Sequence, residues 1–168
     1  MGERAEIVFS ILMAAFVVVL VMTNVIAGKL FLAFPETFPH GLFGEAVTLT
    51  AGLITYPITF LITDVVCEVY GQRRANLMVY TGFAMSLMIL VVIQIALVVP
   101  GSPVWADGNP HYNTVRQMQE AYESVFTLPS MLVLGSMSAY LAAQLLDVKL
   151  FHFWKKVTHG RHLWLRNN

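Results

Sequence analysis

The hydrophobic and polar positions along the chain form four long apolar stretches separated by short polar segments. Each stretch holds about the 20 apolar residues that a helix needs to cross a hydrocarbon core of roughly 30 Å. A spanning segment must also satisfy its own backbone hydrogen bonds, which excludes an isolated strand. We therefore predict an all-α, polytopic helical membrane protein with four transmembrane helices, at Ile7–Gly28, Ala46–Cys67, Leu77–Val99 and Leu128–Lys149.

The composition of the 168 residues agrees with this pattern, because 57% are hydrophobic and only 12% are charged. A soluble domain of this length needs more charged residues to cover its surface. The formal net charge is zero, so no overall basicity points to a nucleic-acid partner. The lipid bilayer is the first partner that the sequence implies.

The positive charges are distributed unequally between the two sides of the predicted bundle. With the N-terminus in the cytoplasm, the inner segments carry eight Lys and Arg residues and the outer loops carry two, which is the orientation that the positive-inside rule favours. The inner residues are Arg4, Arg73, Arg74, Lys149, Lys155, Lys156, Arg161 and Arg166, and the outer ones are Lys29 and Arg116.

The outer segment before the last span predicts a short amphipathic helix. Apolar residues recur at helical spacing from Val115 to Val125, and Thr114-x-x-Gln117 is similar to a capping box. We expect this helix to lie on the outer membrane surface. A lid over a substrate vestibule is the alternative, and simple surface packing is favoured over it.

The second span ends with two carboxylates on one face of its helix, since Asp64 and Glu68 are four residues apart and share that face with Phe60. Charged side chains inside a membrane are costly, and they mark substrate or ion pathways. Asp64 is therefore the stronger candidate. Glu68 either pairs with Arg73 or Arg74 at an inner gate, or has simply reached the lipid headgroups.

Pro57 is predicted to lie well inside the second span, where it removes one backbone donor and can kink the helix. The carbonyl groups freed in this way would be available to a ligand. Alternatively, the hydroxyl groups of Thr55, Thr59 and Thr63 satisfy backbone carbonyls locally.

The fourth span combines an amide and a carboxylate with a stripe of small residues. Gln144 and Asp147 are about 60° apart around the helix, with Tyr140 close by, and they indicate a polar cavity. The small residues Gly135, Ala139 and Ala143 favour helix packing.

The remaining polar positions carry less information. Asn24 in the first span and Gln94 in the third are equally consistent with an interhelical hydrogen bond and with a ligand contact. None of the five histidines pairs at metal-ligand spacing, and no nucleophile, phosphate-loop or zinc-protease pattern occurs. We expect no metal, no cofactor and no enzymatic activity.

Two ordered motifs carry a family resemblance. The stretch Tyr56–Ala75, YPITFLITDVVCEVYGQRRA, resembles the signature of the queuosine precursor transporters, also called the vitamin uptake transporter family. A second segment, from Ser138 to Asn168, is similar to that family around Gln144 and Asp147. The matching residues of the first motif are Pro57, Thr59, Phe60, Leu61, Thr63, Asp64, Glu68, Tyr70, Gly71 and Ala75.

The resemblance implies a six-span bundle in the cell inner membrane that imports 7-cyano-7-deazaguanine or 7-aminomethyl-7-deazaguanine. No ATP-binding motif occurs, so the energy comes from an ion gradient or from a partner, or the substrate simply equilibrates. We expect an ion-coupled carrier, because a buried carboxylate can carry a coupling proton. Family chains continue past Asn168, so we expect residues 1–168 to form a single transporter domain lacking its last two spans. The alternatives are a substrate-binding subunit of an energised uptake complex and a truncated homologue that does not transport. A homo-oligomer or an energising partner is compatible with these expectations.

Site residues follow from the chemistry of a guanine-like base, whose ring N–H and exocyclic amine are two adjacent donors that one carboxylate can accept. Aromatic rings supply a stacking surface. The predicted substrate-binding residues are Asp64, Gln144, Asp147, Phe60, Tyr140 and Asn24, and the predicted gate or ion-pair residues are Glu68, Arg73 and Arg74.

Overall fold

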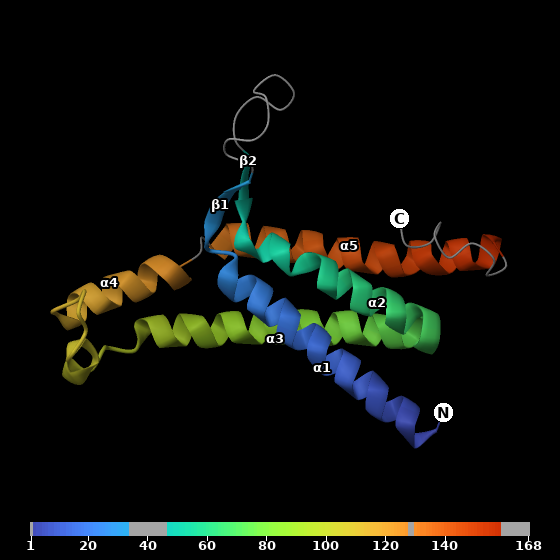
Figure 1. The fold of residues 1–168 in the computed structure, drawn as a ribbon, viewed down its shortest axis with the longest axis horizontal. Helices are drawn as coiled ribbons and strands as arrows, with labels where there is room; N and C mark the ends of the chain where they lie inside the picture. The colour runs from blue at the N-terminus through green and yellow to red at the C-terminus, as the bar shows by residue number, and fades with distance from the viewer. Residues whose placement is uncertain (1, 34–46, 128–129, 159–168) are drawn as a thin grey trace.

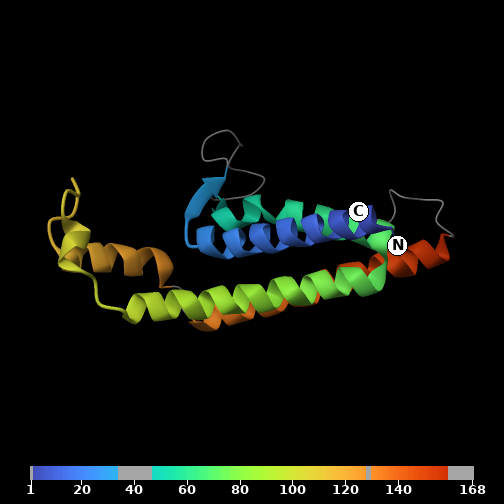
Figure 2. The same cartoon turned by 90° about the horizontal axis from the view of Figure 1, so that it is seen from below.

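The computed structural model describes residues 2–33, 47–127 and 130–158. Four long helices pack in two layers (Figures 1 and 2). Helices α1 (Glu3–Ile26) and α2 (Tyr56–Tyr70) form one layer, and α3 (Gln72–Val98) and α5 (Ser130–Val157) form the other. Helix α2 contacts the other three, so its polar face is enclosed by the bundle.

The shorter elements lie at one end of the bundle. Strands β1 (Leu30–Ala33) and β2 (Val47–Thr50) form an antiparallel pair with Leu30 opposite Thr50. The 3-10 helix η1 (Ala51–Ile54) joins β2 to α2. The 3-10 helix η2 (Pro103–Ala106) and helix α4 (Val115–Phe126) follow α3, and Figure 1 shows α4 beyond its end.

Three helical stretches in the described part of the chain are long and apolar enough to cross a membrane: Glu3–Ile26, Ala51–Tyr70 and Gln72–Val98. Helix α5, with 28 residues, packs against α2 and α3 where the fourth span is expected. The predicted class, an all-α polytopic membrane protein, is confirmed. The two-stranded β-sheet was not predicted from the apolar pattern of the sequence.

The predicted start of the second span is wrong. Ala46 lies outside the described residues, and the next eight residues form β2 and η1, so that α2 begins only at Tyr56. Val47–Thr50 is rich in β-branched residues and pairs with β1, which overrides its apolar fit to a helix.

Pro57 consequently lies in the first turn of α2, where its missing N–H costs nothing, and it does not kink a span. The hydroxyl groups of Thr59 and Thr63 donate to the carbonyls of Tyr56 and Thr59. The local alternative for these threonines is therefore confirmed.

Helices α2 and α3 are joined by a single residue, Gly71, with φ 80° and ψ 174°. This region of backbone space is essentially restricted to glycine. Because α3 starts at Gln72 rather than Leu77, Arg73 and Arg74 lie in its first turn and not in a loop.

The core lies between the four long helices, and α1 approaches α3 most closely within it. Gly82 of α3 faces Phe16 and Leu20 of α1, and a Cβ atom at Gly82 would come within 2.5 Å of Phe16 Cε1. The close approach of the two helices therefore requires glycine. The buried core comprises Phe9, Phe16, Leu20, Val66, Cys67, Ala75, Met78, Val79, Val148 and Phe151.

The amphipathic helix predicted after Thr114 is confirmed as α4. The Thr114 hydroxyl accepts from the Gln117 backbone N–H at 3.3 Å, and the Gln117 side chain accepts from the backbone N–H of Asn113. In Figures 1 and 2, however, α4 extends beyond the bundle roughly along its long axis. The location of α4 on the outer membrane surface stays a prediction.

The small-residue stripe of α5 does not pack against another described helix. Gly135, Ala139 and Ala143 are exposed, and a Cβ atom at Gly135 would meet open space. The helix packing predicted for this stripe is absent within residues 2–33, 47–127 and 130–158.

Candidate functional site

The polar residues of α2 and α5 meet along one seam between the two helices. Tyr56 stacks on Tyr140 near the beginning of the seam, and Glu68 pairs with Lys155 near its end. Since residue numbers rise together on both helices, α2 and α5 run in the same direction. The rise from Tyr56 to Glu68 is about 18 Å along α2, so the seam follows most of that helix.

Gln144 occupies the middle of the seam and is fully buried. Its Nε2 donates to the Tyr140 hydroxyl at 2.9 Å and to the Thr59 hydroxyl at 3.4 Å. Its Oε1 lies 3.2 Å from the Thr63 hydroxyl and shares the proton of that group with the Thr59 carbonyl, which is 2.9 Å away. A buried amide that is satisfied at both ends joins α2 and α5 in one register.

Aromatic rings surround the Tyr140 side chain. The ring of Tyr140 stacks on Tyr56, with centroids 5.4 Å apart and an interplanar angle of 27°. Phe60 approaches the same ring edge-on at 6.4 Å. The predicted pair Phe60 and Tyr140 is therefore brought together, with Tyr56 as a third ring.

Asp64 and Asp147 lie about one helical turn further along the seam, and both are half-buried. Asp64 follows Phe60 by four residues on α2, and Asp147 follows Gln144 by three on α5, so both carboxylates lie on the seam side of their helices. Asp64 Oδ1 and Asp147 Oδ2 are buried and have no hydrogen-bond partner among the described residues. Buried carboxylate oxygens without donors are costly, and a ligand, a proton or a cation would satisfy them.

The charged end of the seam differs from the predicted arrangement. Glu68 accepts a hydrogen bond from Lys155 Nζ at 3.1 Å. Arg74 forms a two-point ion pair with Glu6 of α1, at 2.6 Å for each bond, and lies over the Phe9 ring. Arg73 is exposed. Arg74 thus joins α3 to α1, and the salt bridge from α2 goes to α5.

Asn24 lies apart from the carboxylates, near the C-terminal end of α1. It lines a cavity of only about 10 Å³ with Tyr56, Ser136 and Tyr140, and its buried Nδ2 has no partner in the described part of the chain. A cavity of this volume holds about one water molecule. The space beside the Tyr56–Tyr140 stack is closed in this conformation.

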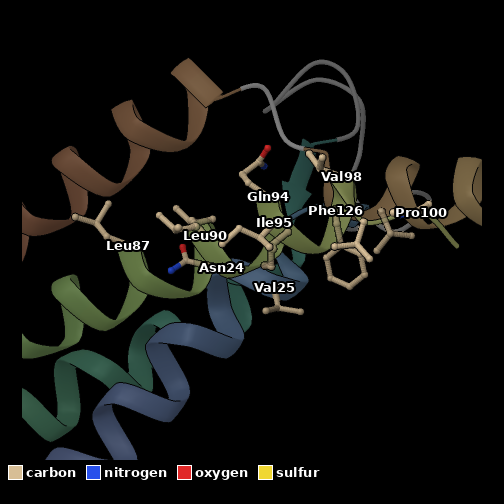
Figure 3. Close-up of a pocket in the computed structure, with 13 residues that line it drawn as sticks. Asn24, Val25, Leu87, Leu90, Gln94, Ile95, Val98, Pro100 and Phe126 are labelled. Carbon is tan, nitrogen blue, oxygen red and sulfur yellow. The ribbon is translucent and has the colours of Figure 1, made fainter.

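Asn24 also lines a much larger groove of about 930 Å³ between α1, α3 and α4 (Figure 3). The other polar side chain among its lining residues is Gln94, which is exposed. All remaining lining residues are apolar, and none belongs to α2 or α5. With so few polar groups the groove offers little to the donor and acceptor edges of a nucleobase, so its size alone does not make it the substrate site.

Sequence reasoning missed the interhelical partners within the seam. Tyr56 and Lys155 were not predicted site residues, and Thr59 and Thr63 were assigned only a backbone role. Thr59 and Thr63 are four residues apart, as are Tyr140 and Gln144, so each pair lies on one helix face. This shared spacing was the signal in the sequence that could have predicted their contact. No group of three or more His, Cys, Asp or Glu residues within the described ranges could hold a metal ion.

Comparison with known proteins identifies the family. Residues 50–168, which include both α2 and α5, match the model of the family described as "Putative vitamin uptake transporter". The chain belongs to this family. The resemblance seen in the two sequence motifs is thereby confirmed. In this vitamin uptake transporter family member the first motif covers α2 and the start of α3, and the described part of the second motif lies in α5.

One relative carries a more specific name. The chain is 33% identical over 127 residues to the "Probable queuosine precursor transporter" of Bacillus subtilis (strain 168), an alignment covering 75% of this chain. The alignment covers 50% of the relative, so the chain spans about half the length of that protein. No solved structure matches this vitamin uptake transporter family member.

Proposed function

We propose that this chain takes part in importing the queuosine precursors 7-cyano-7-deazaguanine and 7-aminomethyl-7-deazaguanine across the cytoplasmic membrane, as an ion-coupled carrier. The observation that carries the proposal is a pair of buried carboxylate oxygens, on Asp64 and Asp147, that have no partner in the part of the chain that the structure describes. They lie in a seam of a vitamin uptake transporter family member. The name of the Bacillus subtilis relative supports the substrate class.

The substrate would bind along the α2–α5 seam. A carboxylate accepts the ring N–H and the exocyclic amine of a deazaguanine together, and such charge-assisted pairs are strong and directional. Asp64 and Asp147 supply two such acceptors, and Phe60 and Tyr140 supply aromatic surface. Asn24 would serve the outer end of the path, because it lines the small cavity beside Tyr140.

Access to this site would require the seam to open. The Tyr56 and Tyr140 rings contact each other directly, and the cavity beside them is too small for a base. In the proposed cycle these two rings separate to admit the substrate. At the other end, the salt bridge between Glu68 and Lys155 would break when the site opens to the cytoplasm.

Ion coupling would use the same two carboxylates. Each of the two acids has one buried oxygen without a donor among the described residues, and the uptake of one proton or cation would compensate for this. Substrate and ion would then occupy the seam together. Neutralising either acid should weaken both substrate binding and the response of uptake to the ion gradient.

Uptake of labelled 7-cyano-7-deazaguanine into cells that cannot synthesise precursors tests the proposal, comparing this chain with a version extended by the relative's remaining length. We expect Asp64→Asn and Asp147→Asn each to lower uptake at least about tenfold, the effect of about 1.4 kcal/mol. Asp107→Asn, at an exposed acid between η2 and α4, is the matched control. Unchanged uptake by both seam variants at normal expression would exclude this site.

A further inference from the structure

Gln144 is the most completely enclosed polar side chain of the seam. It is fully buried, and both of its amide hydrogens as well as its oxygen have partners within the protein. A substrate could form a strong hydrogen bond to Gln144 only by displacing one of these partners. This arrangement suits a side chain that orients others.

The directions of the hydrogen bonds can be assigned from the number of protons available. The single hydroxyl proton of Thr59 is donated to the carbonyl of Tyr56 at 2.7 Å, so Thr59 Oγ1 acts as the acceptor for Gln144 Nε2. The second amide hydrogen of Gln144 is donated to the Tyr140 oxygen. That oxygen is thus an acceptor, and the proton of Tyr140 is left to be donated elsewhere.

The ring of Tyr140 is fixed while its hydroxyl proton can rotate. Stacking on Tyr56 and edge contact with Phe60 hold the ring plane. Tyr140 also lines the small cavity, and Thr59 lies beside its hydroxyl group. A ligand carbonyl entering this space would receive the Tyr140 proton once the hydroxyl group turns towards it.

We propose that Gln144 is a positioning residue, which makes the Tyr140 hydroxyl a hydrogen-bond donor to the carbonyl of the substrate base without touching the substrate. This inference rests on the proposed function. It assigns complementary tasks along the seam, with Asp64 and Asp147 accepting from the donor edge of the base and Tyr140 donating to its acceptor. A ligand lacking that carbonyl would gain nothing from Tyr140.

The hydrogen-bond arrangement can be tested without any ligand, on the purified full chain. The Raman doublet of a tyrosine reports whether its oxygen accepts or donates, and subtracting the Tyr140→Phe spectrum isolates Tyr140. We expect acceptor character in the wild type and its loss in Gln144→Met, which keeps the length of the side chain. Gln94→Met, at an exposed glutamine of α3, is the matched control and should leave the doublet unchanged.

The functional part is tested by the affinity of the purified chain for labelled 7-cyano-7-deazaguanine. Removing a single hydrogen bond between neutral groups lowers affinity about 2- to 13-fold, which is the loss we expect for Tyr140→Phe. We expect Gln144→Met to lose no more than this, and the double variant to be no weaker than Tyr140→Phe alone, because both changes remove the same bond.

The outcomes are distinguishable. If the losses of affinity multiply in the double variant, Gln144 contacts the substrate itself and the proposal is wrong. A Raman doublet that does not change in Gln144→Met would also overturn the proposal. Failure of the wild type to bind the precursor would overturn the proposed function, and with it the role of Tyr140 in substrate binding. The Raman doublet would still show whether Gln144 donates to Tyr140. If Gln144→Met does not fold, Gln144→Leu also removes both donors with a shorter side chain.

Discussion

Some contacts of single residues in the seam follow from helical spacing along the sequence, and others follow only from the arrangement of the helices. The helical period put Asp64 and Glu68 on one face of α2, and Gln144 near Asp147 on α5, from the sequence alone. It did not reveal that Thr63 donates to Gln144, because the two residues are 81 positions apart. Contacts of this kind depend on which helices become neighbours.

Thr63 provides a test of the interhelical hydrogen bond. Thr63→Val keeps the shape of the side chain but leaves Gln144 Oε1 without its donor, which should cost about 1–3 kcal/mol of stability for a buried polar group. Thermal unfolding in detergent measures the effect, and Thr63→Ser, which retains the hydroxyl group, is the control. Equal stability of Thr63→Val and the wild type would contradict the assigned bond.

At the scale of elements, the turn between α2 and α3 and the direction of α5 determine the site. Gly71 is the only residue between α2 and α3, so the two helices are antiparallel neighbours. Helix α5 runs parallel to α2, which agrees with the second and fourth spans crossing a membrane in the same direction. The polar seam exists only because of this alignment.

Gly71→Ala tests the turn. Its backbone values of φ 80° and ψ 174° lie where a side chain costs about 1–3 kcal/mol, so we expect a loss of stability of that size. Gly135→Ala is the control, since its Cβ atom meets open space on an exposed helix face. Thermal unfolding of both variants in the same detergent gives the comparison, and a neutral Gly71→Ala would refute the turn geometry.

The parallel arrangement can be tested by cross-linking. In a Cys67→Ala background, which removes the free cysteine, we expect Glu68→Cys with Lys155→Cys to be joined by a short bifunctional thiol reagent. Tyr56→Cys with Lys155→Cys, at opposite ends of the seam, should not react as a pair. Proteolysis between the helices followed by electrophoresis detects the link, and the reverse result would mean antiparallel helices.

At the scale of the whole molecule, the charges gather at the end of the bundle that holds the N-terminus. The ion pairs Glu6–Arg74 and Glu68–Lys155 lie at this end, and the β-hairpin and α4 lie towards the other (Figure 1). Arg161 and Arg166, which also support the predicted orientation, fall outside the described residues. The cytoplasmic N-terminus remains a prediction based on this charge bias.

Labelling of single cysteines in intact cells tests the orientation. In the Cys67→Ala background, an impermeant thiol reagent should label Asp107→Cys, before α4, and should not label Gln72→Cys, at the α2–α3 turn. Both positions are exposed, so access differs only by the side of the membrane. Permeabilised cells provide the control in which both react, and external labelling of Gln72→Cys alone would reverse the orientation.

The sequence by itself determined the membrane class, the family and the acidic and aromatic residue types of the seam, because bilayer thickness and helical period act locally along the chain. The β-hairpin, the late start of α2 and the pairing of Glu68 with Lys155 were decided by tertiary structure. Each of these depends on segments that are distant in sequence. The same holds for Gln144: its residue type suggested a ligand contact, and only the positions of Thr59, Thr63 and Tyr140 show that its hydrogen bonds are already used.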